Sequence, residues 1–172
     1  MQKIQVSIIM GSDSDLKIMK SAVDILNDFG IGNEVAIISA HRTPEILDSY
    51  VKSLKSRGVQ IVISGAGGAA ALPGVIAALT PIPVVGVPIN SSNSIDGWDS
   101  ILSILQMPSG IPVATVALDG AKNAGLLAIR ILALQDNVIA KKLEAFILEM
   151  KEKVKAKSAK IDELGMNPAK LE

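Results

Sequence analysis

Three short segments carry the side chains whose types and spacing could do chemistry. They are GSDSD at 11–15, SAHRTPE at 39–45 and GAGGAAALPG at 65–74. The first offers hydroxyls and carboxylates, the second an imidazole beside a guanidinium, and the third a stretch of nearly bare backbone. Hydroxyls, backbone amides and an arginine are the groups that hold phosphates, and one imidazole is enough for proton transfer. The three segments therefore predict a site for a phosphorylated small molecule.

The GSDSD segment ends a predicted strand and opens a helix. Gly11 permits a tight turn, and the hydroxyls of Ser12 and Ser14, with the amides of the helix start, could hold a phosphate. Asp13 or Asp15 could accept hydrogen bonds from ribose hydroxyls. The alternative is ordinary helix capping, for which Ser and Asp are preferred residues.

The SAHRTPE segment carries His41, the only histidine in the protein, and Arg42, one of three arginines. It follows the second predicted strand and precedes a helix start marked by Thr43 and Pro44. The chain has no second histidine and no cysteine, which argues against a metal site. General acid–base catalysis needs only one imidazole, so we expect that role for His41. A purely structural histidine is the alternative.

The glycine-rich segment contains Gly65-x-Gly67-x-x-Ala70, which formally matches a relaxed dinucleotide-binding pattern. The match is poor, because the segment follows the third strand rather than the first and Pro73 interrupts the expected helix. Bare backbone here could approach a flat ring or a small carboxyl group, or it could serve tight helix–sheet packing. Two further stretches, 90–97 and 106–113, have the composition of a mobile lid and a rigid turn, without chemistry of their own.

Short β-branched runs alternate with helical patterns, which is typical of a parallel sheet with crossover helices. Strands are expected at 4–10, 34–38, 60–64, 83–89 and 113–118. Helices are expected at 15–29, 43–58, 98–106, 121–134 and 137–157, and a short helix after the glycine-rich segment is expected to end near Leu79. This rhythm predicts a three-layer flavodoxin-like α/β sandwich with strand order 2-1-3-4-5. The binding crevice of such a sheet opens at the carboxyl ends of the strands, where the three segments would meet.

Length, composition and charge limit the domain organisation, the partners and the location that we expect for the protein. The 172 residues are expected to form one domain over 1–158 with a C-terminal tail at 159–172. Equal numbers of basic and acidic residues, 17 each, and an aromatic content of 2 % argue against a nucleic-acid partner. The start has no signal-peptide pattern and no apolar stretch is long enough for a bilayer, so we expect a cytoplasmic protein without a membrane partner.

Taken together, the segments closely resemble the N5-carboxyaminoimidazole ribonucleotide mutase family. The resemblance runs from Val6 through Leu134 and is carried by MGSDSD, SAHRTPE, GAGGAAALPG, VVGVPI, LSILQMPSGIPVAT and NAGLLAIRIL, in family order and spacing. It implies an isomerase of de novo purine synthesis that moves a carboxyl group from an exocyclic nitrogen to a ring carbon. It also implies no metal, nucleotide cofactor or ATP, and a homo-octamer with active sites at subunit junctions.

Carried over position by position, the resemblance makes His41 the acid–base group and Arg42 a phosphate ligand. The residues implied to bind the substrate are Ser12, Asp15, Ser39, Arg42, Gly67, Gly68, Ala69 and Leu72. In this set, the backbone at 67–69 with Leu72 resembles the wall against the aminoimidazole and its carboxylate. One position departs from the family: members generally carry a second histidine in GGAAHLPG, where this chain has Ala71.

Two other functions stay open. A related carboxylase would use free carbon dioxide and aminoimidazole ribonucleotide, and an assay with and without bicarbonate separates it from a mutase. A non-catalytic flavodoxin-like module would bind a nucleotide or a signalling partner. A phosphoacceptor receiver would need an aspartate where this chain has Ser64-Gly65, and a flavin site would need aromatic partners, of which only Trp98 is near in the sequence.

Overall fold

The computed structural model describes residues 3–163. They fall into two compact units, one ending at Ile129 and one beginning at Arg130. The first unit contains the sheet and the segments at 11–15, 39–45 and 65–74. The prediction that residues 1–158 form a single domain stays a prediction. Most of the expected tail, residues 164–172, lies outside the described part of the chain.

The sheet has five parallel strands in the order β2-β1-β3-β4-β5. Their bounds are β1 Val6–Met10, β2 Asn33–Ile37, β3 Ile61–Gly67, β4 Val84–Ile89 and β5 Ala114–Thr115. The order reverses between β1 and β3, as the sequence predicts, so the chain leaves these neighbouring strands in opposite directions across the sheet. The predicted fold is confirmed.

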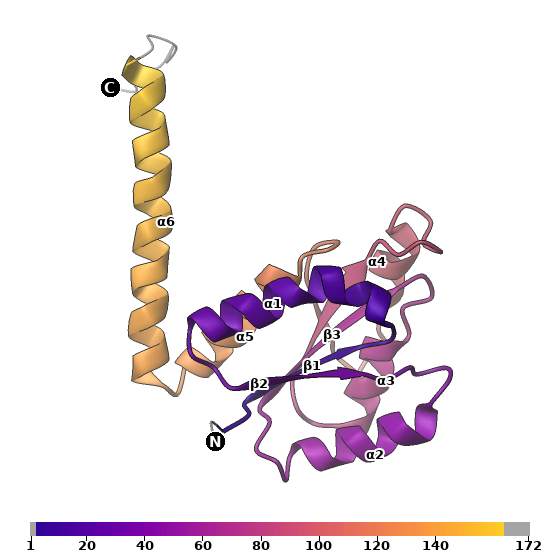
Figure 1. Cartoon of the computed structure of the whole chain (residues 1–172). Helices are drawn as coiled ribbons and strands as arrows, with labels where there is room; N and C mark the ends of the chain where they lie inside the picture. The colour runs from indigo at the N-terminus through magenta and orange to yellow at the C-terminus, as the bar shows by residue number, and fades with distance from the viewer. Residues whose placement is uncertain (1–2, 164–172) are drawn as a thin grey trace. The chain divides into compact units, whose positions relative to one another are not determined.

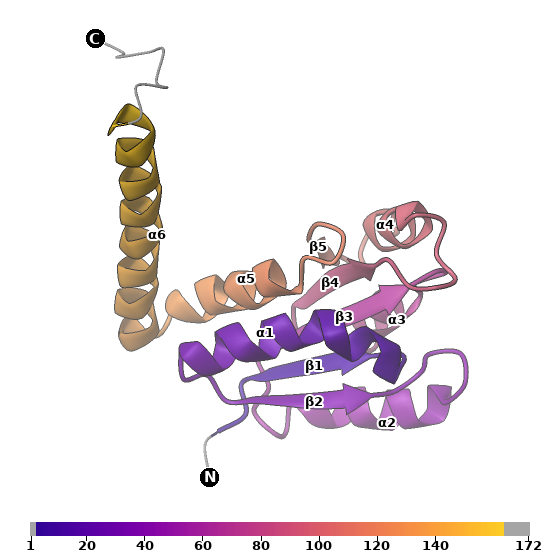
Figure 2. The same cartoon turned by 45° about the horizontal axis from the view of Figure 1, so that its top comes forward.

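Helices cover both faces of the sheet (Figures 1 and 2). The helices of the first unit are η1 Asp13–Asp15, α1 Leu16–Asp28, α2 Pro44–Leu54, α3 Leu72–Leu79, α4 Trp98–Leu105 and α5 Ala121–Ala133, the last of which runs into the second unit, and α6 Asn137–Glu163 belongs to the second unit. On one face α5 packs on α1, where Gly125 lies directly against Ile25. On the other face α2, α3 and α4 share one hydrophobic cluster with the sheet.

Central strands explain why the unit is stable with so few aromatic residues. Every residue of β1 and β4 is buried, and both read as nearly continuous aliphatic runs because helices cover both faces of a parallel sheet. The cluster beneath α2, α3 and α4 joins Ile9 and Val62 of the sheet to Leu47, Ile76 and Ile104 of the three helices. Burying each such side chain contributes about 1.5–3 kcal/mol.

Two strands differ most from the sequence prediction. β3 does not stop at Ser64 but continues through Gly67, because Gly65, Ala66 and Gly67 pair with the last residues of β4. β5 is only two residues long, because it is an edge strand that pairs with β4 at Val85 and Gly86 alone. The glycine-rich segment therefore begins as a rigid strand, which matters for the site below.

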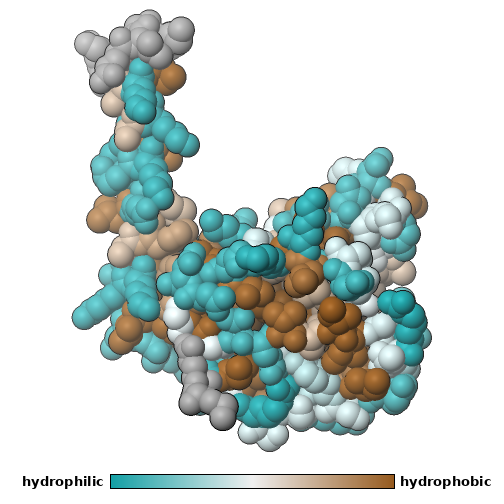
Figure 3. Space-filling view, viewed as in Figure 1, coloured by the Kyte–Doolittle hydropathy of each residue, from teal (hydrophilic) through white to brown (hydrophobic). Residues whose placement is uncertain are grey.

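The final helix also extends further than expected. α6 reaches Glu163, five residues beyond the boundary predicted for the tail. Several apolar side chains of α6 are exposed, among them Val138, Leu148 and Val154, and brown apolar atoms are visible among the teal ones on this helix in Figure 3. Within residues 3–163, no helix is both long and apolar enough to cross a membrane.

Candidate active site

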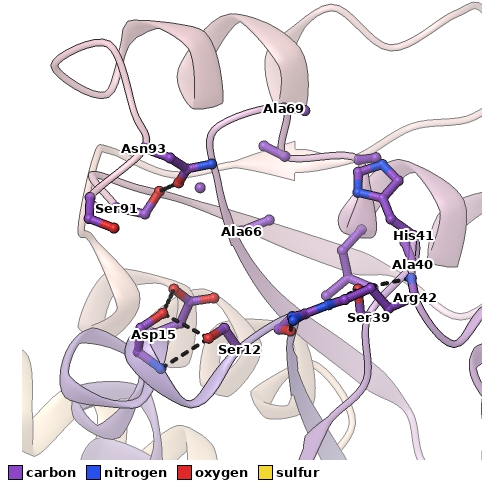
Figure 4. Close-up of a pocket in the computed structure, with 17 residues that line it drawn as sticks. Ser12, Asp15, Ser39, Ala40, His41, Arg42, Ala66, Ala69, Ser91 and Asn93 are labelled. Carbon is purple, nitrogen blue, oxygen red and sulfur yellow. Dashed lines mark hydrogen bonds between the residues drawn. The ribbon is translucent and has the colours of Figure 1, made fainter.

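A cavity of about 460 Å³ opens at the carboxyl ends of the first four strands. Its lining comes from the loops that follow β1, β2 and β4 and from the end of β3 with the start of α3 (Figure 4). The three predicted segments do meet in one place. The lining residues are Gly11, Ser12, Ser14, Asp15, Ser39, Ala40, His41, Arg42, Ala66, Gly67, Ala69, Ala70, Ala71, Leu72, Ser91, Ser92 and Asn93.

The loop after β1 presents hydroxyls and one buried carboxyl group. Ser12 is the N-cap of η1, and its Oγ accepts hydrogen bonds from the amide of Ser14 at 3.3 Å and from the Ser14 hydroxyl at 2.9 Å. The capping alternative is therefore correct for Ser12. Capping does not remove Ser12 from the site, because its side chain still lines the cavity.

Asp15 is the buried acid of this loop. Only 5 % of it is exposed, and loss of hydration raises the pKa of its carboxyl group above the usual value, while the Ser14 hydroxyl partly opposes that rise. The carboxyl group lies beside the cavity with Ser14 as its side-chain donor at 3.3 Å. Remaining lone pairs of Asp15 can accept hydrogen bonds from hydroxyls of a bound molecule.

The loop after β2 is a closed turn that holds Arg42 in place. Thr43 closes it, since its amide and its hydroxyl both donate to the Ser39 carbonyl, at 3.0 and 3.1 Å. The Ser39 hydroxyl accepts from the Arg42 amide at 3.2 Å and from Arg42 Nε at 3.4 Å. Arg42 Nη2 then donates to the Gly11 carbonyl at 3.1 Å, which joins the loops after β1 and β2.

This arrangement leaves part of the guanidinium available for a ligand. Nη1 of Arg42 has no hydrogen-bond partner among residues 3–163, and the side chain lies in the cavity wall opposite Ser91 and Asn93 (Figure 4). A guanidinium can donate two parallel hydrogen bonds to a phosphate or carboxylate. The Ser39 hydroxyl therefore helps to position the Arg42 side chain, a role that its place in the motif alone does not reveal.

His41 sits at the tip of the same turn. It is exposed, its ring makes no hydrogen bond to any described residue, and it lines the cavity. A structural histidine is usually buried and hydrogen-bonded, and this one is neither. The ring is available for proton transfer to a bound molecule.

The wall formed by the end of β3 is built from backbone and small side chains. Gly67, Ala69 and Leu72 line the cavity, as expected, but Gly68 does not. Gly68 has a positive φ of 59°, and a Cβ there would lie 2.8 Å from the Asn93 amide nitrogen. Gly68 therefore allows a loop to approach rather than forming the lining itself.

The departure from the family pattern also falls on the cavity wall. Ala71 lines the cavity as the N-cap of α3, and no side chain caps that helix. Next to it, Ala70 has a φ of 44°, in the left-handed region that non-glycine residues rarely adopt. The Ala69 carbonyl of this wall is held by a residue that does not line the cavity, because the Ser103 hydroxyl of α4 donates to it at 2.6 Å.

The loop after β4 supplies lining residues that the sequence patterns did not identify. Ser91, Ser92 and Asn93 all line the cavity, and the Ser91 hydroxyl donates to Asn93 Oδ1 at 2.7 Å. The sequence signals for them are their position directly after a buried strand at the same edge of the sheet and the lid-like composition of residues 90–97. Among the described residues, no group of three or more His, Asp or Glu side chains could hold a metal ion.

Comparisons with known families, proteins and structures give results that agree with one another. The chain matches the AIR carboxylase family over residues 5–153. It is 56 % identical to the N5-carboxyaminoimidazole ribonucleotide mutase of Pyrococcus horikoshii, over 95 % of this chain and 92 % of that protein. It is 51 % identical to the phosphoribosylaminoimidazole carboxylase of Saccharomyces cerevisiae, over 96 % of this chain but only 29 % of that protein. A crystal structure of Treponema denticola PurE superposes with a TM-score of 0.83 at 33 % identity, over 91 % of this chain and 98 % of that one.

Proposed function

The chain belongs to the AIR carboxylase family, and we propose that it acts as an N5-carboxyaminoimidazole ribonucleotide mutase, an isomerase of purine biosynthesis. The observation that carries this proposal is 56 % identity to a protein of that name over nearly the full length of both chains. The cavity agrees with such a substrate, since it combines a guanidinium, hydroxyls, a buried carboxyl group and an imidazole. A ribonucleotide has a phosphate, a ribose and a heterocycle for these groups to bind.

We assign the phosphate to Ser12 and Arg42. Both line the cavity, and the Gly11 carbonyl fixes the guanidinium between the two loops that carry them. Asp15 accepts hydrogen bonds from the ribose, for which its position beside the hydroxyl-rich loop suits it. Gly67, Ala69 and Leu72 then provide the wall for the flat aminoimidazole ring.

The reaction needs two proton movements, and we assign both to His41. The carbamate C–N bond breaks as the exocyclic nitrogen takes a proton, which gives carbon dioxide and aminoimidazole ribonucleotide. The ring carbon then attacks carbon dioxide, and loss of the proton from that carbon restores the aromatic ring. One imidazole that delivers the first proton and takes up the second leaves no net change in protons. With Ala71 in place of a histidine, His41 is the only imidazole in the chain.

Retention of the carboxyl carbon tests the proposal against the carboxylase reaction. The substrate carries ¹³C in its carbamate, and the assay contains unlabelled bicarbonate. A mutase that keeps carbon dioxide in the cavity until it is recaptured gives product with the label largely retained. A carboxylase gives unlabelled product, and it forms product from aminoimidazole ribonucleotide and bicarbonate alone. Loss of the label would replace the proposed mutase by the carboxylase.

We also propose that the protein assembles as a homo-octamer. Apolar side chains are exposed on α4 (Trp98, Leu102, Leu105) as well as on α6. Exposed apolar surface of this kind is typical of an interface between subunits. Sedimentation at micromolar concentration is expected to give a single species of about eight chains, and a monomer would refute the assembly. The cytoplasmic location stays a prediction.

A further inference from the structure

We propose that the Asn93 side-chain amide donates a hydrogen bond to the substrate carboxylate that is moved, and that Ser91 orients it for this contact. The inference rests on the proposed mutase function and adds a specificity-determining residue to it. Neither residue belongs to the motifs at 11–15, 39–45 or 65–74. Both come from the loop after β4, which closes the remaining side of the cavity.

The first support is the orientation of the amide. The Ser91 hydroxyl donates to Asn93 Oδ1 at 2.7 Å, which occupies the acceptor end of the amide. Figure 4 shows the nitrogen end directed into the space between the loops. Nδ2 has no acceptor among residues 3–163, although Asn93 lines the cavity. The pair therefore presents two N–H donors to a ligand and no acceptor.

The second support is how closely this loop approaches the cavity wall. A Cβ at Gly67 would collide with the Ser91 side chain, and one at Gly68 would lie 2.8 Å from Asn93 Nδ2. A side chain at Gly68 would push the amide away from the wall, and one at Gly67 would displace the Ser91 side chain that orients the amide. The two glycines thus place the Asn93 donors beside the bare backbone at which we locate the aminoimidazole ring.

The third support is the distribution of charge around the cavity. Arg42, the cation of the lining, lies on the side opposite Asn93, whereas Ala66 and Ala69 form the wall next to Asn93 and the carboxyl group of Asp15 lies on the same side as Ser91 (Figure 4). If Arg42 holds the phosphate, the Asn93 amide can supply side-chain donors to a carboxylate that lies against the backbone at 67–69. A neutral amide suits a carboxylate that must become neutral carbon dioxide during the reaction, because a full cation would stabilise the charged ground state more strongly.

Two ligands that differ only in the carboxylate, the product and the decarboxylated intermediate, test this contact. Binding of 4-carboxy-5-aminoimidazole ribonucleotide and of aminoimidazole ribonucleotide is measured by calorimetry. Asn93→Asp should weaken binding of the carboxylated ligand by about tenfold, because a donor to a charged group becomes a repelling charge. Asn93→Ala should weaken it less, and Ser91→Ala less again. None of the three should change the affinity for aminoimidazole ribonucleotide.

Asn123→Asp is the matched control, because it makes the same change of charge at an exposed position of α5 that does not line the cavity. It should leave both affinities unchanged. An equal loss of affinity for both ligands in Asn93→Asp would mean that Asn93 contacts the ribose or phosphate, and it would overturn the inference. Unchanged affinity for both ligands would overturn it as well. A wild-type protein that fails to isomerise N5-carboxyaminoimidazole ribonucleotide would instead refute the proposed function.

Discussion

His41→Asn separates catalysis from binding and from folding. His41 is exposed and its ring makes no hydrogen bond to a described residue, so the substitution leaves no cavity and no unpaired group. Surface changes of this kind alter the free energy of unfolding by about 0.5 kcal/mol or less. The groups assigned to phosphate and ribose, Ser12, Arg42 and Asp15, keep their own hydrogen bonds. We therefore expect an intact fold that still binds ribonucleotide.

The rate is expected to fall steeply. A positioned acid–base group contributes roughly 10²- to 10⁴-fold to a rate, and each factor of ten corresponds to about 1.36 kcal/mol of activation free energy. Loss of His41 should thus raise the barrier by about 2.7–5.4 kcal/mol. Because Ala71 stands at the position of a second family histidine, no other imidazole of the chain can take over.

Steady-state kinetics with N5-carboxyaminoimidazole ribonucleotide give kcat and KM, calorimetry with aminoimidazole ribonucleotide gives binding, and thermal unfolding checks the fold. His41→Gln serves as a second variant with a different side-chain length. The expected result is a kcat at least about a hundredfold lower with a dissociation constant within about twofold of the wild type. Near-normal kcat in both variants, with the fold intact, would show that His41 is not the catalyst.

Three further predictions follow from the cavity. Arg42→Lys should raise KM about tenfold, because a point charge replaces a planar fork. Arg57→Lys is its control, since Arg57 pairs with Glu34 at 2.6 Å outside the cavity, and unchanged KM in Arg42→Lys would place the phosphate elsewhere. Ser12→Ala should weaken ribonucleotide binding several-fold while kcat falls little, and an effect on kcat alone would argue for a different role. Asp15→Asn should raise KM and also raise the melting temperature at neutral pH. Burial raises the pKa of Asp15 in the folded protein, so folding favours the protonated carboxyl group and ionisation destabilises the fold as pH rises through that pKa. The gain in the variant should vanish as pH falls below the ordinary aspartate range, and a constant gain at all pH values would contradict this cause.

Much of the fold follows from local pattern. The short aliphatic runs and the helices between them predict a parallel sheet. The crossover of a strand–helix–strand unit is right-handed, and the helices of such units cover both faces of the sheet. Pro44 after Thr43 marks where α2 begins, and GSDSD marks the turn into η1 and α1. Parallel strands bring their carboxyl ends to one edge, so the meeting of the three motif loops was predictable without coordinates.

Tertiary structure decided which side chains face each other across the cavity. The sequence patterns indicated the glycines at 65–68, yet only the structure shows that Gly68 accommodates Asn93 while Gly67 still lines the cavity. The sequence patterns also did not show that the Ser39 hydroxyl holds Arg42, or that Ser91 orients the Asn93 amide. These contacts join segments that are remote in the chain or depend on a side-chain rotamer. Local propensity describes the backbone of one segment, whereas rotamers and loop-to-loop distances are set by packing between segments, so only the folded chain determines them.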